Sequence, residues 1–251
     1  MKLFRFLLFP FAILYDAVTA IRNFLFDVHV LKSNSFKIPT IVVGNLSVGG
    51  TGKTPQIEYL IKLLKKNHKI GVLSRGYGRK TKGFLQVDAT KTTTEVGDEP
   101  LQFSKKFKDI SVAVDENRVN GIQQLTNAEV VLLDDAFQHR KVKAGFYVLL
   151  TKYNELFSND FVLPTGNLRE RRIGVKRADV VVITKCPSTI DEQEQQDLKQ
   201  LIRRYFNGPV FFSSITYADF LMSNNTSKIK TSELSNYEVL LVTGIANPKP
   251  L

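Results

Sequence analysis

A glycine-rich segment between an apolar strand and an amphipathic helix constrains the fold of this chain more than any other feature. Residues 38–43 form a short β-branched run, which is typical of a buried parallel strand. The sequence GNLSVGGTGKTP follows at 44–55, and apolar residues then recur at helical spacing over 57–64. Strand, glycine loop and helix in this order predict a phosphate-binding loop in an α/β fold of the P-loop NTPase kind.

The loop residues have the chemistry that binding a nucleoside triphosphate requires. Glycines let backbone N–H groups surround the β- and γ-phosphates without Cβ clashes, and the helix N-terminus adds its dipole. Lys53 is expected to contact phosphate oxygens, and the Thr54 hydroxyl to ligate Mg²⁺. The predicted ATP-binding residues are Ser47, Val48, Gly49, Gly50, Thr51, Gly52, Lys53 and Thr54.

Two departures from related loop patterns affect this interpretation. Ser47 occupies the first position of the general G-x-x-x-x-G-K-[ST] motif, where glycine is usual. The segment 49–54 also resembles the loop of partitioning and septum-site ATPases, which carry a second lysine directly before the two glycines. This chain has Val48 there. That difference counts against the alternative hypothesis, in which the chain is a membrane-associated regulatory ATPase with no lipid substrate.

Two acidic sites are candidates for metal binding and proton transfer. Residues 129–133 are an apolar strand that ends in Asp134 and Asp135, and a carboxylate at this position can hold Mg²⁺. In strand register the two aspartates point to opposite sides, so we expect one of them to face the metal, without assigning which. Capping of the next turn is the alternative. Asp98, in VGDEP just before the helical pattern 101–107, is either a helix N-cap or a general base that takes a proton from an attacking hydroxyl.

Arginines that could stabilise the charge of phosphoryl transfer follow several of the predicted strands. Arg75 lies in the SRGYG segment and Arg118 follows the strand 110–114. Arg169, Arg171 and Arg172 form a cluster, which could instead be a solvated face. Pro164 and Gly166 before this cluster favour a shaped loop.

The N-terminal segment predicts an amphipathic helix. Residues 3–26 are strongly apolar, but the unbroken apolar run is 6–15, about half the ~20 residues that a spanning helix needs. We therefore expect a helix that lies in the membrane interface, not one that crosses it. A signal peptide and a helix packed on the protein's own sheet are the alternatives. The expected apolar face is Leu14, Ala17, Val18, Ile21, Phe24 and Leu25, flanked by Lys2, Arg5, Arg22 and Lys32.

Composition narrows the class of protein further. The chain has 251 residues, is 43% hydrophobic and 24% charged, and carries a formal net charge of +11, which favours an anionic partner. Nucleic acid is not expected, because the basic residues are dispersed and no aromatic-basic motif is present. The single cysteine, Cys186, excludes an internal disulfide, and with three histidines a His-rich metal centre is not expected either.

The spacing of the remaining elements predicts alternating strands and helices. Strands are expected near 38–43, 69–73, 110–114, 129–134, 146–151, 179–184, 209–213 and 238–243, with a helix near 190–206. This alternation indicates mainly parallel sheets with ligands at the carboxyl ends of the strands. We expect an N-terminal interfacial helix over 1–34, a nucleotide-binding domain over 35–155 and a second, smaller α/β domain over 156–251.

Six motifs in one order resemble the tetraacyldisaccharide 4′-kinase family of lipid A biosynthesis in Gram-negative bacteria. They are GNLSVGGTGKTP at 44–55, LSRGYG at 73–78, GDEP at 97–100, DDAFQH at 134–139, LPTGNLRE at 163–170 and GIANP at 244–248. The resemblance implies ATP- and Mg²⁺-dependent phosphorylation of the 4′-hydroxyl of an acylated glucosamine disaccharide 1-phosphate. It also implies a peripheral position on the cytoplasmic face of the inner membrane, with no obligate protein partner.

Matched position by position, the resemblance assigns roles to individual residues. Asp98 is the implied catalytic carboxylate, with Lys53 and Arg118 beside it, and Thr54, Asp134 and Asp135 lie near the metal. The implied substrate-binding residues are Arg75, Tyr77, Glu99, Gln138, His139, Asn167, Arg169 and Glu170. In the family, further chain with an Asp-His pair follows the GIANP motif, whereas this sequence stops at Leu251. We therefore expect a C-terminally shortened form, with its activity in doubt and nucleotide binding largely retained.

Overall fold

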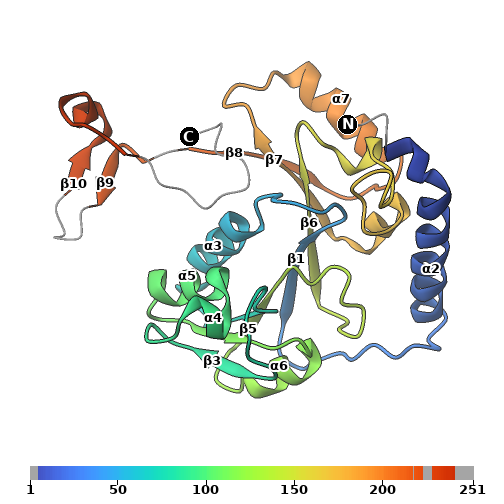
Figure 1. Ribbon diagram of the computed structural model, residues 1–251, viewed down its shortest axis with the longest axis horizontal. Helices are drawn as coiled ribbons and strands as arrows, with labels where there is room; N and C mark the ends of the chain where they lie inside the picture. The colour runs from blue at the N-terminus through green and yellow to red at the C-terminus, as the bar shows by residue number, and fades with distance from the viewer. Residues whose placement is uncertain (1–4, 217, 223–227, 241–251) are drawn as a thin grey trace.

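A parallel β-sheet forms the centre of the molecule in a computed structural model of the chain, which describes residues 5–216, 218–222 and 228–240 (Figure 1). The order of its eight strands is β3-β4-β2-β5-β1-β6-β7-β8, and only the β3–β4 pair is antiparallel. The strands are β1 (Thr40–Asn45), β2 (Ile70–Ser74), β3 (Leu85–Val87), β4 (Ser111–Val114), β5 (Val130–Asp134), β6 (Phe146–Lys152), β7 (Val180–Cys186) and β8 (Val210–Ser214). This confirms the expected fold class.

Helices cover both faces of the sheet, which explains why its strands read as continuous apolar runs. Successive residues of a strand face opposite sides, so Val42 and Val43 of β1 belong to two different cores. The helices of the described chain are α2 (Phe9–Asp27), α3 (Lys53–Leu64), α4 (Thr93–Val96), α5 (Asp98–Lys106), α6 (Arg118–Gln124) and α7 (Glu192–Arg203). Short 3₁₀ turns are η1 (Phe6–Leu8), η2 (Phe157–Asn159), η3 (Arg172–Arg177) and η4 (Thr231–Asn236).

The strands assigned to a second domain continue the same sheet. β6 pairs in parallel with β7, and β7 with β8, so no break in the sheet coincides with the expected boundary at residue 155. Beyond β8, a hairpin of β9 (Phe220–Met222) and β10 (Lys228–Lys230) extends away from the sheet (Figure 1). The strand expected over 238–243 has no regular structure in 238–240, and its remainder lies outside the described residues, as does the GIANP motif.

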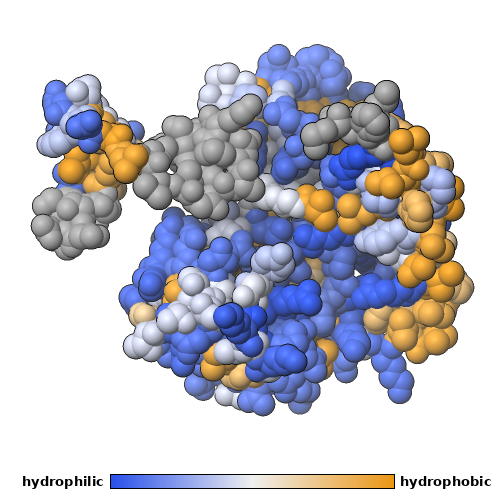
Figure 2. All heavy atoms as spheres, viewed as in Figure 1, coloured by the Kyte–Doolittle hydropathy of each residue, from blue (hydrophilic) through white to orange (hydrophobic). Residues whose placement is uncertain are grey.

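The N-terminal helix lies along the side of the molecule with its apolar face exposed (Figure 2). Leu14, Val18, Ile21 and Phe24 are 58–65% exposed, whereas only Ala12 and Phe26 of α2 are buried. Together with η1, the helix spans 22 residues, and in the described part of the chain it alone is long and apolar enough to cross a membrane.

Two arginines that flank the apolar face of this helix bond to the rest of the protein. The Arg5 side chain donates to the carbonyl oxygen of Pro164 and to the Asn167 side chain, both at 3.0 Å. Arg22 donates to the carbonyl oxygen of Gln138 at 3.1 Å. Hydrogen bonds from a charged donor to a backbone carbonyl are stronger than neutral ones, so these arginines hold the helix on the protein.

Candidate active site

The phosphate-binding loop joins the carboxyl end of β1 to the first turn of α3. Gly49 and Gly52 have φ values of 97° and 84°, a region that side chains with a Cβ rarely adopt. Gly52 is the N-cap residue of α3, so the free N–H groups of the first turn begin at Lys53. The loop therefore has the backbone geometry that the sequence predicted for an anion site.

Two neighbouring segments hold this loop in place. The Thr184 hydroxyl, at the end of β7, donates to the carbonyl oxygen of buried Thr51 at 2.8 Å. On the other side, the Val48 N–H donates to the Asn167 carbonyl at 2.8 Å and the Arg169 N–H donates to the Leu46 carbonyl at 2.7 Å. The loop is thus clamped between β7 and the segment 167–169.

The two polar residues that open α3 both contact carboxylates. The Lys53 ammonium lies 3.6 Å from Oδ1 of Asp135, and the Thr54 hydroxyl donates to Oε1 of Glu99 at 2.7 Å. Because the hydroxyl uses its hydrogen for this bond, its lone pairs remain available to a cation. Glu99 is the second residue of α5, so this bond brings the GDEP motif to the phosphate-binding loop.

Asp134 is the most strongly perturbed carboxyl group of the site. It ends β5, is 2% exposed, and accepts one hydrogen bond, from the Ser74 hydroxyl at 3.1 Å, while its Oδ1 atom has no partner among the described residues. Burial, followed by the negative charges of Glu99 and Asp135, raises the pKa of Asp134 to about 7. A buried carboxylate oxygen without a donor, surrounded by other carboxylates, fits a cation site.

Asp135 faces the same site as Asp134, although strand register predicts that the two side chains point to opposite sides. Its φ of 47° lies outside the strand region, so the chain turns between the two aspartates, and the charges of Asp135 and Lys53 both act on Asp134. Its Oδ1 atom is 2.9 Å from Nη1 of Arg169 as well as 3.6 Å from Lys53. Asp135 therefore holds two cations, whereas Asp134 has none within salt-bridge distance in the described chain.

Arg118 is buried behind the site and bonded to the main chain. It is 3% exposed and donates to the carbonyl oxygens of Asp115 and Asp134, at 2.6 and 3.2 Å. Burial lowers the pKa of its guanidinium to about 10, so it stays charged at neutral pH. In this arrangement Arg118 positions the ends of β4 and β5.

Asp98 is exposed at the start of α5, where it lines a surface hollow with Gln102 and Lys105 of the same helix. It is the first residue of α5, with Gly97 as the N-cap, so it does not occupy the N-cap position itself. Its exposed carboxylate accepts from the Glu99 N–H at 3.0 Å. A Cβ built on Gly97 would lie 3.0 Å from the Tyr77 carbonyl, which shows how closely the SRGYG loop approaches. Arg75 and Tyr77 are exposed on that loop.

A second network connects the site to α2. Glu170 is 3% exposed and accepts hydrogen bonds from Gln138 at 3.0 Å, from Arg177 at 2.7 Å and from Asn23 of α2 at 2.7 Å. Gln138 also donates to the carbonyl oxygen of Asn45 at the end of β1, at 2.9 Å. The phosphate-binding loop and the apolar helix are therefore separated by a single layer of bonded side chains.

His139 is the one implied substrate residue that lines a different cavity, beside Phe26 and Arg140. Burial, and after it the nearby Arg118, lowers the pKa of its imidazole to about 4, so the ring is neutral at physiological pH. Its Nε2 atom has no partner among the described residues.

Sequence reasoning missed three polar residues that shape the site. Ser74 and Thr184 stand at the ends of apolar strands and bond to Asp134 and the phosphate-binding loop. Asn45 is fully buried at the end of β1. The available signal was a single polar residue at the carboxyl end of a buried strand, where ligands of parallel sheets bind.

Comparison with known proteins identifies the family. A sequence model described as tetraacyldisaccharide-1-P 4′-kinase matches residues 4–251. The chain belongs to this family. It is 54% identical over 254 residues to the tetraacyldisaccharide 4′-kinase of Flavobacterium johnsoniae, covering 100% of this chain and 74% of that protein. Identity to the protein of the same name from Bacteroides thetaiotaomicron is 45% over 258 residues, with 97% and 68% covered.

A solved structure of the family has the same fold. The crystal structure of LpxK from Aquifex aeolicus in complex with ATP superimposes with a TM-score of 0.75 at 35% identity, covering 94% of this chain and 72% of that one. The family matches do not favour the regulatory ATPase.

Proposed function

We propose roles for the residues of this site in the reaction of the family. The chain transfers the γ-phosphate of ATP to the 4′-hydroxyl of a tetraacyldisaccharide 1-phosphate in lipid A biosynthesis. The sugar oxygen bonds to the γ-phosphorus, the bond from that phosphorus to the β–γ bridging oxygen breaks, and ADP leaves. The hydroxyl loses its proton in the same step, so the site must supply a base and compensate negative charge.

The bonds made by Arg169 are the observation that carries this proposal. Its N–H bonds the end of β1, its guanidinium lies 2.9 Å from Oδ1 of Asp135, and its carbonyl accepts from the Tyr15 hydroxyl of α2 at 2.8 Å. One residue thus connects the phosphate-binding loop, an acidic metal-site candidate and an apolar exposed helix. A kinase whose acceptor is a lipid needs all three at one place.

The nucleotide side of the site is assigned to α3 and the loop before it. Backbone N–H groups of 49–54 and the Lys53 ammonium bind the β- and γ-phosphates. Lys53 can leave Asp135 for the phosphate because Arg169 also neutralises that carboxylate. Arg169 then lies where the γ-phosphate and the acceptor meet.

Thr54 and Asp134 would hold Mg²⁺. In the described chain no group of three or more acidic, His or Cys side chains could hold a metal alone. That fits Mg²⁺, which proteins bind through one or two carboxylates plus substrate phosphates and water. When bound, the ion would neutralise charge on the β- and γ-phosphate oxygens. The partnerless Oδ1 of Asp134 and the lone pairs of Thr54 are the ligands that support this assignment.

Asp98 is the proposed general base. It is exposed, so a sugar hydroxyl can reach it, and the bond between neighbouring Glu99 and Thr54 keeps it beside the phosphate-binding loop. We assign contacts with the acceptor to Tyr77 and Arg75, which are exposed on the loop that packs against Gly97. Asn167 and Glu170 shape the opposite wall through the bonds described above.

The exposed face of α2 is proposed to lie in the cytoplasmic leaflet of the inner membrane. Bonds from Tyr15 and Asn23 of α2, and from Arg5 just before η1, hold the other side of the helix on the protein. A helix held in this way can insert its apolar side into the interface without leaving the protein. The acyl chains of the substrate would stay in the same leaflet.

Lipid-dependent ATP turnover by the full chain tests this proposal. We expect ATP consumption and a phosphorylated disaccharide only when the acylated acceptor is present. Asp98→Asn should lower transfer by about 10²-fold or more while ATP binding is kept. Asp109→Asn, an exposed carboxylate that pairs with Lys65 at 2.9 Å, is the matched control and should transfer normally. Equal hydrolysis without the lipid, and no sugar phosphate, would contradict the kinase assignment.

A further inference from the structure

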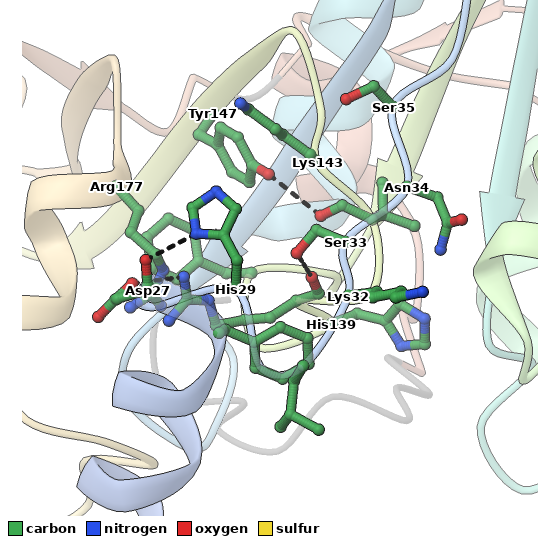
Figure 3. Close-up of a pocket in the computed structure, with 15 residues that line it drawn as sticks. Asp27, His29, Lys32, Ser33, Asn34, Ser35, His139, Lys143, Tyr147 and Arg177 are labelled. Carbon is green, nitrogen blue, oxygen red and sulfur yellow. Dashed lines mark hydrogen bonds and ion pairs between the residues drawn. The ribbon is translucent and has the colours of Figure 1, made fainter.

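A cavity of about 580 Å³ lies at the carboxyl end of α2, and the proposed reaction does not use it (Figure 3). Its walls come from four places: the last turn of α2, the connecting segment 29–35, residues 137–147 up to the start of β6, and Arg177 of η3. Figure 3 shows that the connecting segment with Lys32, Ser33, Asn34 and Ser35 runs along one edge of the pocket. Its volume suits a small organic group.

Positive charge dominates the lining of this pocket. Four Lys or Arg side chains line it, and Asp27 is the one carboxylate among its lining residues. Arg140 bonds to that carboxylate at 2.7 Å and to the Asn23 carbonyl at 2.7 Å, which neutralises the negative end of the helix. Arg177 pairs with Glu170 at 2.7 Å.

Lys32 and Lys143 take no part in these ion pairs. Both are exposed, and neither forms a salt bridge within the described part of the chain. Two such lysines at the rim of one cavity attract an anion. The rings of Phe26, Phe137 and Tyr147 line the floor of the pocket, where the Arg140 guanidinium lies 5.2 Å from the Phe26 ring and that of Arg177 4.7 Å from the Phe137 ring. A floor of aromatic rings and guanidinium groups suits an anionic group attached to carbon chains better than a fully hydrated inorganic anion.

The pocket continues the apolar surface that α2 exposes. Phe24, Val28 and Val30 precede or border it and are 61%, 46% and 67% exposed. Leu31 lines the pocket and is 37% exposed. A helix lying in a bilayer interface would therefore bring the pocket to the depth of the lipid headgroups.

The pocket rim lies far from the γ-phosphate site. Asn34 bridges to Val142, and Tyr147 is the second residue of β6, so these residues mark the amino ends of the central strands. The phosphate-binding loop follows the carboxyl end of β1, and a strand of that length spans roughly 17 Å. None of the residues assigned to ATP or the metal lines the pocket.

We infer that this pocket binds the headgroup of an anionic glycerophospholipid of the membrane, a lipid distinct from the substrate. Lys32 and Lys143 neutralise its phosphate, and the aromatic floor contacts its glycerol. Such a lipid fixes the carboxyl end of α2 at the membrane.

The three histidines of the chain provide the test. His29 and His139 line the pocket, whereas His68 follows α3 on the other face of the sheet. Imidazole ¹H–¹⁵N signals of the full chain would be recorded during titration with dihexanoyl-phosphatidylglycerol below its micelle concentration. We expect the signals of His29 and His139 to shift while that of His68 stays. Dihexanoyl-phosphatidylcholine should cause no comparable shift.

Charge variants give the matched comparison. The double variant Lys32→Ala with Lys143→Ala should bind dihexanoyl-phosphatidylglycerol about tenfold or more weakly, as judged from the lipid concentration that shifts the signals. Each lysine near an anionic lipid surface contributes about fivefold to the affinity. Lys62→Ala with Lys66→Ala, two exposed lysines of α3 and the turn after it, should leave the affinity unchanged. Because no ATP or substrate is present, the result is independent of the proposed reaction.

Three outcomes would overturn the inference. The first is the absence of any shift of the His29 and His139 signals, or equal shifts with the two lipids. The second is the same shift with inorganic phosphate at the same concentration, which would make the pocket a site for free phosphate. The third is tighter binding of glucosamine 1-phosphate than of phosphatidylglycerol, which would assign the pocket to the substrate.

Discussion

Replacing Asp134 by asparagine should stabilise the ligand-free protein at the same time as it disables the site. Burial and the neighbouring carboxylates raise the pKa of Asp134 from 3.8 to about 7. Between these values the folded chain binds a proton that the unfolded chain has lost, so the free energy of unfolding falls as pH rises through this window. One pKa unit corresponds to about 1.4 kcal/mol, so ionised Asp134 costs about 4 kcal/mol above pH 7.

Asparagine has the same shape and no charge to bury. Its oxygen can accept the Ser74 hydroxyl, and its neutral amide is not repelled by the negative charges of Glu99 and Asp135. Between pH 5.5 and pH 8 the free energy of unfolding of the wild type should therefore fall by about 2 kcal/mol relative to Asp134→Asn. For a chain of this length, that equals a change of about 4–8 °C in the difference between the two melting temperatures.

Thermal unfolding at pH 5.5 and pH 8, with and without Mg²⁺-ATP, measures this effect. Without ligand, the advantage of Asp134→Asn should be larger at pH 8. With Mg²⁺-ATP at pH 8, the wild type should gain stability that depends on Mg²⁺, and the variant should lose that part. A pH-independent difference between the two proteins, or a variant less stable than the wild type at pH 8, would refute the reasoning.

Asp115→Asn is the matched control. Asp115 follows β4, which β2 separates from β5, and is 1% exposed, but its carboxylate accepts from the Asn117 N–H at 2.8 Å and from Asn120 Nδ2 at 2.6 Å. In the asparagine variant, the NH₂ group would face one of these two N–H donors and could not accept its hydrogen bond. The free energy of unfolding should therefore fall by about 1–3 kcal/mol at both pH values.

Three further changes test other parts of the structure. Glu170→Gln should lower the free energy of unfolding by about 3 kcal/mol, because Arg177 loses its buried partner, and urea denaturation would measure the loss. Thr184→Val removes the bond to the Thr51 carbonyl and should weaken ATP binding about fivefold by calorimetry, with unchanged affinity as the contrary result. Ile21→Glu, at a position 60% exposed on α2, should reduce co-sedimentation with anionic vesicles about tenfold or more, whereas Leu63→Glu, 56% exposed on α3, should not.

The sequence predicted most strands of the sheet to within two or three residues. β1, β5 and β7 are buried on both faces, so they read as apolar runs bounded by polar or glycine-rich segments. The edge strand β3 was not predicted, because three residues are too few to show a period. Its antiparallel pairing with β4 depends on tertiary contacts.

The sequence predicted which residues form much of the site, but it predicted their arrangement less well. Lys53, Thr54 and the two aspartates followed from the spacing alone, since a strand end and a helix start fix their positions. The turn at Asp135 that brings both aspartates to one site is a local backbone conformation that strand register does not reveal. The pairing of β6 with β7 joins segments about 30 residues apart, and no local pattern distinguishes a continued sheet from a second one.

The bond between Tyr15 and Arg169 joins residues 154 positions apart, and this separation has a consequence for synthesis of the chain. At rates of about 5–20 residues per second, the partners of α2 leave the ribosome about 8–30 s after the helix does. During that time the side of the helix that will face the protein has nothing to bind. The nascent helix can therefore meet a bilayer before its active site exists, and the rest of the enzyme would then fold at the membrane surface.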